Sequence, residues 1–162
     1  MQLGSKESQI PAQAVLAFKL KRILVPVDFS DCSKKALQYA IPFAKQFDAE
    51  LVLLHVIDVT PIAPEVGFVD AQGIPESREE LLCLQKAIGK DVRSTTLIRT
   101  GAPYLQIAQT AVECQADLII ISTHGRKGLS RVVMGSTTER VVRHAHCPVL
   151  IVRQAEHEFI GA

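Results

Sequence analysis

The amino-acid sequence predicts an α/β fold: a single doubly wound, five-stranded parallel sheet in the order 3-2-1-4-5, Rossmann-like, with helices on both faces. Two observations carry this prediction. Short apolar runs alternate along the chain with segments whose apolar residues recur at helical spacing. The runs are continuous, which indicates strands buried on both faces, as in a parallel sheet. Right-handed crossovers then favour the order 3-2-1-4-5.

The first strand–helix–strand unit is the most regular part of the chain. The run 22–27 predicts a strand that ends at Asp28, and Ser30 or Asp31 provides a cap for the next helix. Pro42 lies off the apolar stripe of that helix, which predicts a bend on the solvent side. The run 51–56 predicts the second strand. The inward stripe of the helix consists of Ala36, Leu37, Ala40, Ile41, Ala44 and Phe47.

The remaining elements follow a long segment without periodicity, residues 58–75, which predicts a loop. Capping-box patterns at Ser77–Glu80 and Ser136–Glu139 predict the starts of two helices. The first of these helices presents Leu81, Leu84 and Ile88 inward. Strands are expected at 92–98, 118–122 and 148–152. Another helix is expected to begin at 101–103, with Ile107, Ala108, Ala111 and Val112 inward.

Composition favours one globular domain in the cytoplasm, with no nucleic-acid or membrane partner. The chain has 162 residues, 22% of them charged, and a formal net charge of +1. No apolar run approaches the roughly 20 residues of a membrane span, and no signal-peptide pattern is present. We expect an N-terminal tail over 1–20, an α/β domain over 21–153 and a C-terminal tail over 154–162. The cysteines at 32, 83, 114 and 147 show no metal-ligand spacing and are expected to be reduced and mostly buried.

The predicted strand order brings two distant segments together. The sheet reverses direction between its first and fourth strands, and their carboxyl ends flank an open crevice. Asp28 follows the first strand, and the segment 122–125, Ser-Thr-His-Gly, follows the fourth. Gly135 then precedes the hydroxyl-rich helix start Ser136-Thr137-Thr138. Glycines and a helix N-terminus together make an anion cradle, so this edge is a candidate nucleotide site.

Each of these features also has a simpler explanation. The glycine-containing segment can be an ordinary strand-to-helix turn, and Asp28 can cap the following helix instead of accepting hydrogen bonds from a ribose or adenine. Ser136 can act only as a helix cap. Arg126, in the loop, is placed to neutralise phosphate charge or simply to face solvent.

Several catalytic motifs are absent from the sequence. There is no GxxxxGK[ST] P-loop, so efficient hydrolysis of a nucleoside triphosphate of that type is not predicted. There is no GxSxG and no HExxH motif. A phosphoacceptor site of the receiver type is disfavoured because the third predicted strand is followed by Arg99-Thr100 and not by an aspartate. We assign no catalytic residue and no metal ligand.

Four segments of the chain resemble the universal stress protein family. They are ILVPVDFS at 23–30, LHV at 54–56, the pair STHGRKGL and GSTTERV at 122–129 and 135–141, and CPVLIV at 147–152. The likeness runs from about Lys21 to Arg153. The ATP-binding branch of the family has a Gly-x2-Gly-x9-Gly-Ser/Thr pattern. Gly125, Gly135 and Ser136 match its later elements with the nine-residue gap, whereas Ser122 replaces the first glycine.

The resemblance implies an ATP-binding protein, with or without Mg²⁺, that acts as a nucleotide-dependent switch with little or no hydrolysis. It implies that Val27, Asp28 and Val56 hold the adenine and ribose and that Ile121 lies beneath the nucleotide. A second branch of the family binds no nucleotide and acts through protein partners, and Ser122 keeps that alternative open. The expected nucleotide-binding residues are Pro26, Val27, Asp28, Val56, Ile121, Ser122, Gly125, Arg126, Gly128, Gly135, Ser136, Thr137 and Thr138.

The last predicted strand suggests how the protein associates. It contains Val149, Leu150, Ile151 and Val152 without a polar interruption, and it is expected at an edge of the sheet. A bare apolar edge invites pairing with another strand. Pairing with a second copy across a two-fold axis covers it. The family resemblance also implies a homodimer formed through this strand.

Overall fold

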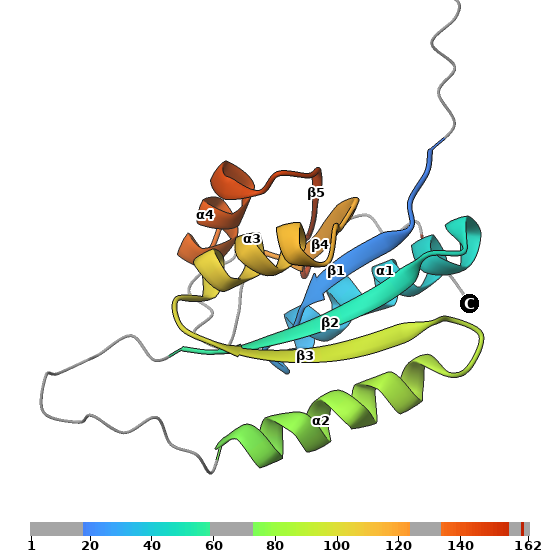
Figure 1. The fold of residues 1–162 in the computed structure, drawn as a ribbon, viewed down its shortest axis with the longest axis horizontal. Coiled ribbons are helices and arrows are strands. Elements are labelled where there is room, and N and C mark those ends of the chain that lie inside the picture. Colours follow the sequence, from blue (N-terminus) through green and yellow to red (C-terminus); the bar gives the residue numbers. More distant parts are fainter. Residues whose placement is uncertain (1–17, 59–72, 124–133, 156–159, 161–162) are drawn as a thin grey trace, which may run out of the picture.

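The protein is described by a computed structural model, in which residues 18–58, 73–123, 134–155 and 160 are described. Strands and helices alternate along the chain (Figure 1). The strands are β1 (Arg22–Pro26), β2 (Glu50–Ile57), β3 (Ser94–Thr100), β4 (Leu118–Ser122) and β5 (Val149–Val152). The helices are α1 (Asp31–Phe47), α2 (Gly73–Ile88), α3 (Pro103–Glu113) and α4 (Ser136–His144).

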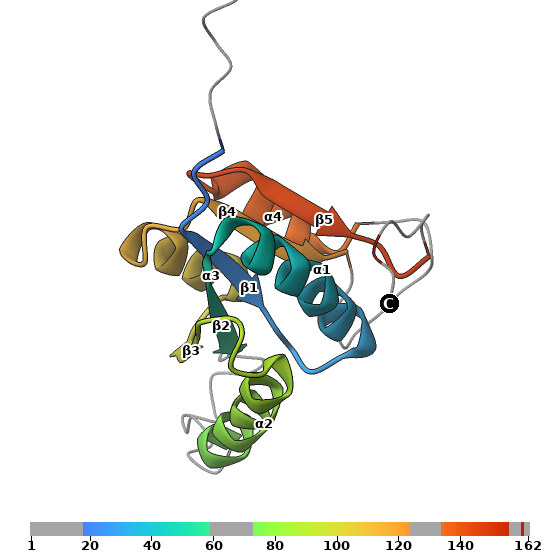
Figure 2. The same ribbon diagram turned by 90° about the vertical axis from the view of Figure 1, so that its right-hand side faces the viewer.

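The strands form one parallel five-stranded sheet in the order β3-β2-β1-β4-β5, which confirms the predicted fold and strand order. Helices α1 and α2 cover one face and α3 and α4 cover the other (Figure 2). Between β1 and β4 the chain changes its direction of winding, since β2 lies on one side of β1 and β4 on the other. That position is the switch point at which ligands bind in open α/β sheets.

Residues of the central strands alternate between two hydrophobic clusters, one on each face of the sheet. Ile23 and Val25 of β1 pack with residues of α1 and α2, whereas Leu24 packs with residues of α3 and α4. All three side chains are fully buried. Successive residues of a strand point to opposite faces of the sheet. Because both faces of the central strands are buried, these strands are unbroken apolar runs in the sequence.

Helix α1 agrees with the sequence in detail. Ser30 is its N-cap, with the side-chain oxygen accepting a hydrogen bond from the Ser33 backbone N–H. Pro42 lies inside the helix and is exposed, as expected. On α3, by contrast, the predicted inward position of Val112 is wrong: its side chain is 57% exposed, and Thr110 occupies the buried face instead.

Both predicted capping boxes are wrong. Helix α2 begins at Gly73, so Ser77 lies inside it and not at its start. Pro75 is tolerated there because N–H groups in the first turn have no intrahelical partner. Helix α4 has Gly135 as its N-cap with no side-chain cap hydrogen bond, and Ser136 is the first helical residue. Within the described residues, no side chain caps the first-turn N–H groups of α4, and such groups bind solvent or a ligand.

The third strand runs later than predicted, over Ser94–Thr100 instead of 92–98. Its pairing with β2 continues to the end of that strand, where the Gly101 N–H donates to the Ile57 carbonyl. Because β3 is an edge strand, polar residues such as Arg99 and Thr100 extend it at little cost.

The cysteines are free but less buried than expected. Cys83 is exposed, and Cys32, Cys114 and Cys147 are half-buried. Desolvation by burial raises the pKa of Cys114 and of Cys147 above the ordinary thiol value. Both thiols are accordingly weak nucleophiles at neutral pH. Within the described ranges, no helix combines the length and apolar character that a membrane span requires.

Candidate functional site

The β1–α1 turn is organised around the Asp28 carboxylate. Its Oδ1 accepts hydrogen bonds from the Ser30 backbone N–H at 3.1 Å and from the Ser30 hydroxyl at 2.6 Å. The Ser30 hydroxyl oxygen in turn accepts from the Ser33 N–H at 3.2 Å and caps α1. Asp28 thus does not cap the helix directly; it orients the residue that does. The Asp28 side chain is half-buried.

The same turn is held from the neighbouring strand. The Val27 N–H donates to the Leu54 carbonyl at 2.8 Å. The Val27 carbonyl lies 2.8 Å from Nδ1 of His55, which is a buried residue of β2. Phe29 adopts a φ of 66° and its ring lies 4.5 Å from the His55 ring, centroid to centroid. The position of Asp28 therefore depends on contacts on both sides of it in the sequence.

The second segment of the site is the connection from β4 to α4, whose two ends are tied together. The Gly135 N–H donates to the Thr123 carbonyl at 2.8 Å, and the Thr138 hydroxyl donates to the Ser122 carbonyl at 2.8 Å. Ser122 and Thr138 are both buried. The Thr138 proton is thereby used within the protein, so this side chain positions the start of α4 and leaves phosphate donation to other groups.

Ser122 itself lies in extended backbone at the end of β4. It is not among the described non-glycine residues with positive φ, which are Phe29, Asp48 and Gln115. A glycine at this position would therefore serve to leave space and would not be needed for its backbone angles. The side chain is only 6% exposed.

The N-terminus of α4 is the anion-binding element of the arrangement. Ser136 is exposed and Thr137 half-buried, and both belong to the first turn, where unpaired N–H groups and the helix dipole favour negative charge. The predicted residues Gly125, Arg126 and Gly128 precede this helix in the sequence and lie outside the described residues.

The predicted residues that the structure describes gather at the carboxyl ends of β1, β2 and β4. Pro26, Val27 and Ile121 are buried at these ends, and Val56 is half-buried. The β1–β4 register pairs Ile23 with Leu118 and Leu24 with Ile119. If this register is continued along the two strands, Val27 comes level with Ser122. The turn at Asp28 and the start of α4 therefore lie at one edge of the sheet, flanking the switch point.

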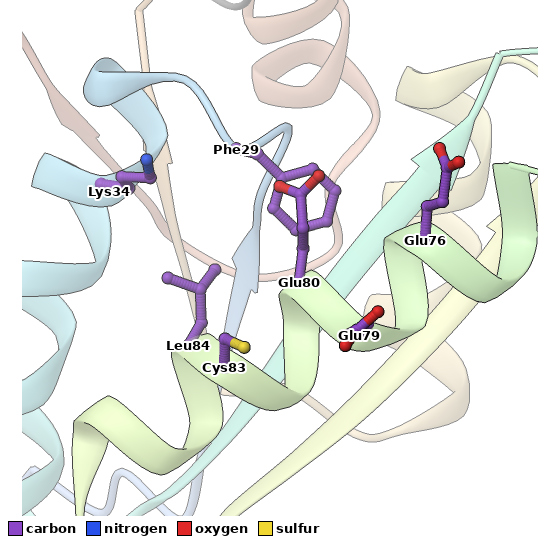
Figure 3. Close-up of a pocket in the computed structure, with 7 residues that line it drawn as sticks. All are labelled: Phe29, Lys34, Glu76, Glu79, Glu80, Cys83 and Leu84. Carbon is purple, nitrogen blue, oxygen red and sulfur yellow. The ribbon is translucent and has the colours of Figure 1, made fainter.

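A cavity that sequence reasoning missed lies between α1 and α2, on the opposite face of the sheet from α4 (Figure 3). Its volume is about 510 Å³. Phe29 connects it to the turn that carries Asp28. Three carboxylates of α2 and one lysine of α1 contribute to the lining, which is therefore acidic. The lining residues are Phe29, Lys34, Glu76, Glu79, Glu80, Cys83 and Leu84.

This cavity does not overlap the predicted nucleotide site. The helical spacing of Glu76, Glu80 and Leu84 was visible in the sequence, but an acidic stripe of that kind is usually a solvated face. Among the described residues there is no group of three histidine, cysteine or acidic side chains suited to hold a metal ion.

Comparison with known proteins identifies relatives along almost the whole chain. The profile of the Universal stress protein family matches residues 19–153. A universal stress protein of Methanocaldococcus jannaschii is 38% identical over 144 residues, which cover 85% of each chain. The universal stress protein YxiE of Bacillus subtilis is 34% identical over 145 residues, covering 82% of this chain and 98% of the relative.

Solved structures of the same fold agree with these sequence matches. The universal stress protein UspA of Lactobacillus plantarum superimposes with a TM-score of 0.76 at 29% identity, covering 85% of this chain and 100% of that one. Two more distant structures were determined with nucleotides. One is a universal stress protein in complex with cAMP, at 24% identity, and the other is from Archaeoglobus fulgidus in complex with dAMP, at 22% identity. Each has a TM-score of 0.64, and these two likenesses establish the fold alone.

Proposed function

Because this chain belongs to the universal stress protein family, we propose that it binds ATP at the carboxyl edge of its sheet and acts in the cytoplasm as a nucleotide-dependent switch with little or no hydrolysis. The observation that carries this proposal is the convergence of two segments at the switch point. The Asp28 turn comes from one side, and the open N-terminus of α4 comes from the other. The complexes of distant family members with cAMP and dAMP support an adenine nucleotide as the ligand.

The two segments supply complementary chemistry. The half-buried Asp28 carboxylate is a charged acceptor at the end of β1, suited to accept from a ribose hydroxyl or an adenine amino group. Apolar side chains at the strand ends flank the base, as Val27, Val56 and Ile121 are placed to do. The first-turn N–H groups of α4, with the hydroxyls of Ser136 and Thr137, receive the phosphates. Gly125, Arg126 and Gly128 of the preceding loop complete the proposed set, and Mg²⁺ would accompany the phosphates.

Such a site suits a switch better than a hydrolase. The sequence has no P-loop lysine to stabilise the charge that develops on a leaving phosphate. A switch requires only that nucleotide bind two states of the protein with different affinity. The end of β4 and the start of α4 are joined by the hydrogen bonds from Gly135 to Thr123 and from Thr138 to Ser122. Nucleotide bound there would therefore act on α4 directly.

One observation favours a second candidate, a stress protein that works through protein partners without nucleotide. Ser122 stands where the nucleotide-binding pattern has a glycine, and its side chain is buried at the edge of the proposed site. If its Cβ and hydroxyl fill the space needed by the ribose or phosphates, the site is closed.

Titration calorimetry of the purified protein with ATP, with and without Mg²⁺, separates the two candidates. We expect saturable 1:1 binding with a dissociation constant on the order of 10 µM, or about −7 kcal/mol. Mass spectrometry of the protein as purified would then detect bound adenine nucleotide. If neither experiment shows any adenine nucleotide, the protein-partner candidate replaces the ATP switch.

Ser122→Gly is expected to change ATP affinity by no more than about tenfold, or roughly 1.4 kcal/mol. The reason is that Ser122 lies in extended backbone, where glycine brings only additional space. Parallel titrations of both proteins measure the difference. Ser94→Gly, at the start of the distant β3, controls for the general cost of glycine in a strand. A wild type that does not bind beside a tightly binding Ser122→Gly would mean that serine has closed the site.

We also propose that the protein is a homodimer formed through β5. Among the described strands β5 pairs only with β4, so one side of its backbone is open. The Pro148 and Val152 carbonyls accept hydrogen bonds from β4, at Ile119 and Thr123. Because parallel ladders use alternate residues, Val149 and Ile151 direct their N–H and C=O groups away from β4. This apolar strand therefore presents unpaired donors and acceptors at an edge, which a second copy can satisfy.

A further inference from the structure

The β1–α1 turn contains a backbone conformation that requires support. Phe29 has a φ of 66°, in the left-handed region that a bulky side chain rarely adopts. Such a conformation persists only where the surrounding contacts over-determine it. Phe29 directly follows Asp28, so contacts that hold Phe29 also constrain the backbone that carries the Asp28 side chain.

His55 of β2 supports this turn in addition to the hydrogen bonds made by Ser30 and Ser33. Its Nδ1 lies 2.8 Å from the Val27 carbonyl, and its ring lies against the Phe29 ring at 4.5 Å between centroids and 34° between planes. The last β1–β2 register pair is Pro26 with Leu54, so His55 supplies a donor where the regular ladder ends. The side chain is 9% exposed. His55 thus contacts the residues on both sides of Asp28.

The alternation of β2 places His55 behind the proposed site. Leu51 and Leu53 belong to the cluster beneath α1 and α2, and His55 continues that series. Val56 packs instead with the cluster beneath α3 and α4, the face that carries the proposed phosphate-binding helix. His55 and Val56, which are neighbours at the end of β2, therefore have different roles. Val56 faces the proposed adenine pocket, and His55 supports the Asp28 turn from the other face.

We propose that His55 is a positioning residue of the nucleotide site, holding the Val27 carbonyl and the Phe29 ring so that Asp28 is presented to the ribose. The proposal rests on the nucleotide binding proposed above. A carbonyl only accepts hydrogen bonds, so Nδ1 of His55 must carry a proton. The neutral ring is then the Nδ1–H tautomer, with Nε2 unprotonated. His55 acts through the turn and touches no ligand.

Three substitutions separate hydrogen bonding at this position from mere filling of the core. His55→Asn retains an amide nitrogen at the branch position of Nδ1, whereas His55→Gln moves it one bond further out, as Nε2 is. His55→Leu fills the space without any donor. We expect Asn to bind ATP within about threefold of wild type, and Gln and Leu to bind about tenfold more weakly or worse. Thermal melts in the absence of ATP report the structural cost of each change.

If His55→Leu does not fold, the Asn and Gln variants decide the question, since they differ only in the reach of the same amide. Equal affinity for all folded variants, or equal loss in Asn and Gln, would overturn the proposal. A readout independent of ATP is the histidine tautomer, measured near neutral pH by long-range ¹⁵N–¹H correlation in the free protein. The Nδ1–H signature supports the proposal and an Nε2–H signature refutes it. A wild type with the Nδ1–H signature that binds no ATP would instead refute the proposed function alone.

Discussion

An Asp28→Ala variant is expected to bind ATP about tenfold to a hundredfold more weakly than the wild-type protein. The reason is the loss of a charged acceptor: hydrogen bonds to ionised groups contribute about 1.5–3 kcal/mol each, and one such bond to the ribose or adenine accounts for the range. The Asp28 carboxylate also accepts two hydrogen bonds from Ser30. Its removal therefore loosens the turn as well as deleting the contact. Calorimetric titration with ATP measures the effect.

Two further variants determine whether the charge or the turn is responsible. Asp28→Asn keeps an oxygen that can accept from the Ser30 N–H while removing the charge, so an intermediate affinity is expected. Asp31→Ala removes the same charge from the exposed first turn of α1 and is expected to bind like the wild type. On the α4 side of the switch point, Gly135→Val adds a branched side chain at the N-cap of α4 and should also weaken binding. If Asp28→Ala binds ATP as tightly as the wild-type protein, the result contradicts ATP binding at the switch point.

Ile151→Pro is expected to convert a dimer into a folded monomer. Ile151 directs its N–H away from β4, so proline removes a donor at the free edge and leaves the β4–β5 ladder intact. Proline is tolerated at such edge positions and blocks the approach of another strand. Size-exclusion chromatography with light scattering reports the mass, and circular dichroism reports whether the sheet persists.

The matched control for this experiment lies on the other edge of the sheet. Thr96 of β3 likewise directs its N–H away from its neighbour β2, because the ladder uses Arg93 and Gly101 on either side of it. Thr96→Pro therefore makes the same chemical change at the wrong edge and is expected to leave the dimer unaffected. A wild-type protein that is monomeric at micromolar concentration, or an Ile151→Pro variant that remains dimeric, contradicts assembly through β5.

The sequence was sufficient to predict the fold because the deciding feature is the alternation of strand-like and helical patterns along the whole chain. Burial on both faces of β1 produces a continuous apolar run, and five strand-like segments separated by helical patterns admit few strand orders. The helix starts were not predictable in the same way. Ser77-x-x-Glu80 matches a capping box, yet α2 begins at Gly73. A capping-box pattern is compatible with a helix start at that position, but it does not by itself determine where the helix begins.

In the candidate site, too, some features could be predicted from the sequence and others could not. Asp28, Gly135 and Ser136 could be proposed from the sequence because the strand order places the ends of β1 and β4 at one edge of the sheet. The hydrogen bond from Thr138 to the Ser122 carbonyl and the approach of His55 to the Val27 carbonyl could not be proposed in this way. Both depend on where a backbone oxygen points after the turn has formed. No pattern of residue types encodes that direction.

The two edges of the sheet differ in a way that bears on how far association can proceed. Edge strand β3 has the sequence STTLIRT, in which polar and charged side chains predominate, whereas β5 is VLIV. If two copies join through β5, the combined sheet ends in β3 on both sides, and no apolar edge remains to recruit a third copy. Because the combined sheet ends in polar strands, the protein would use strand pairing to form a dimer, and the pairing would not continue into a fibril.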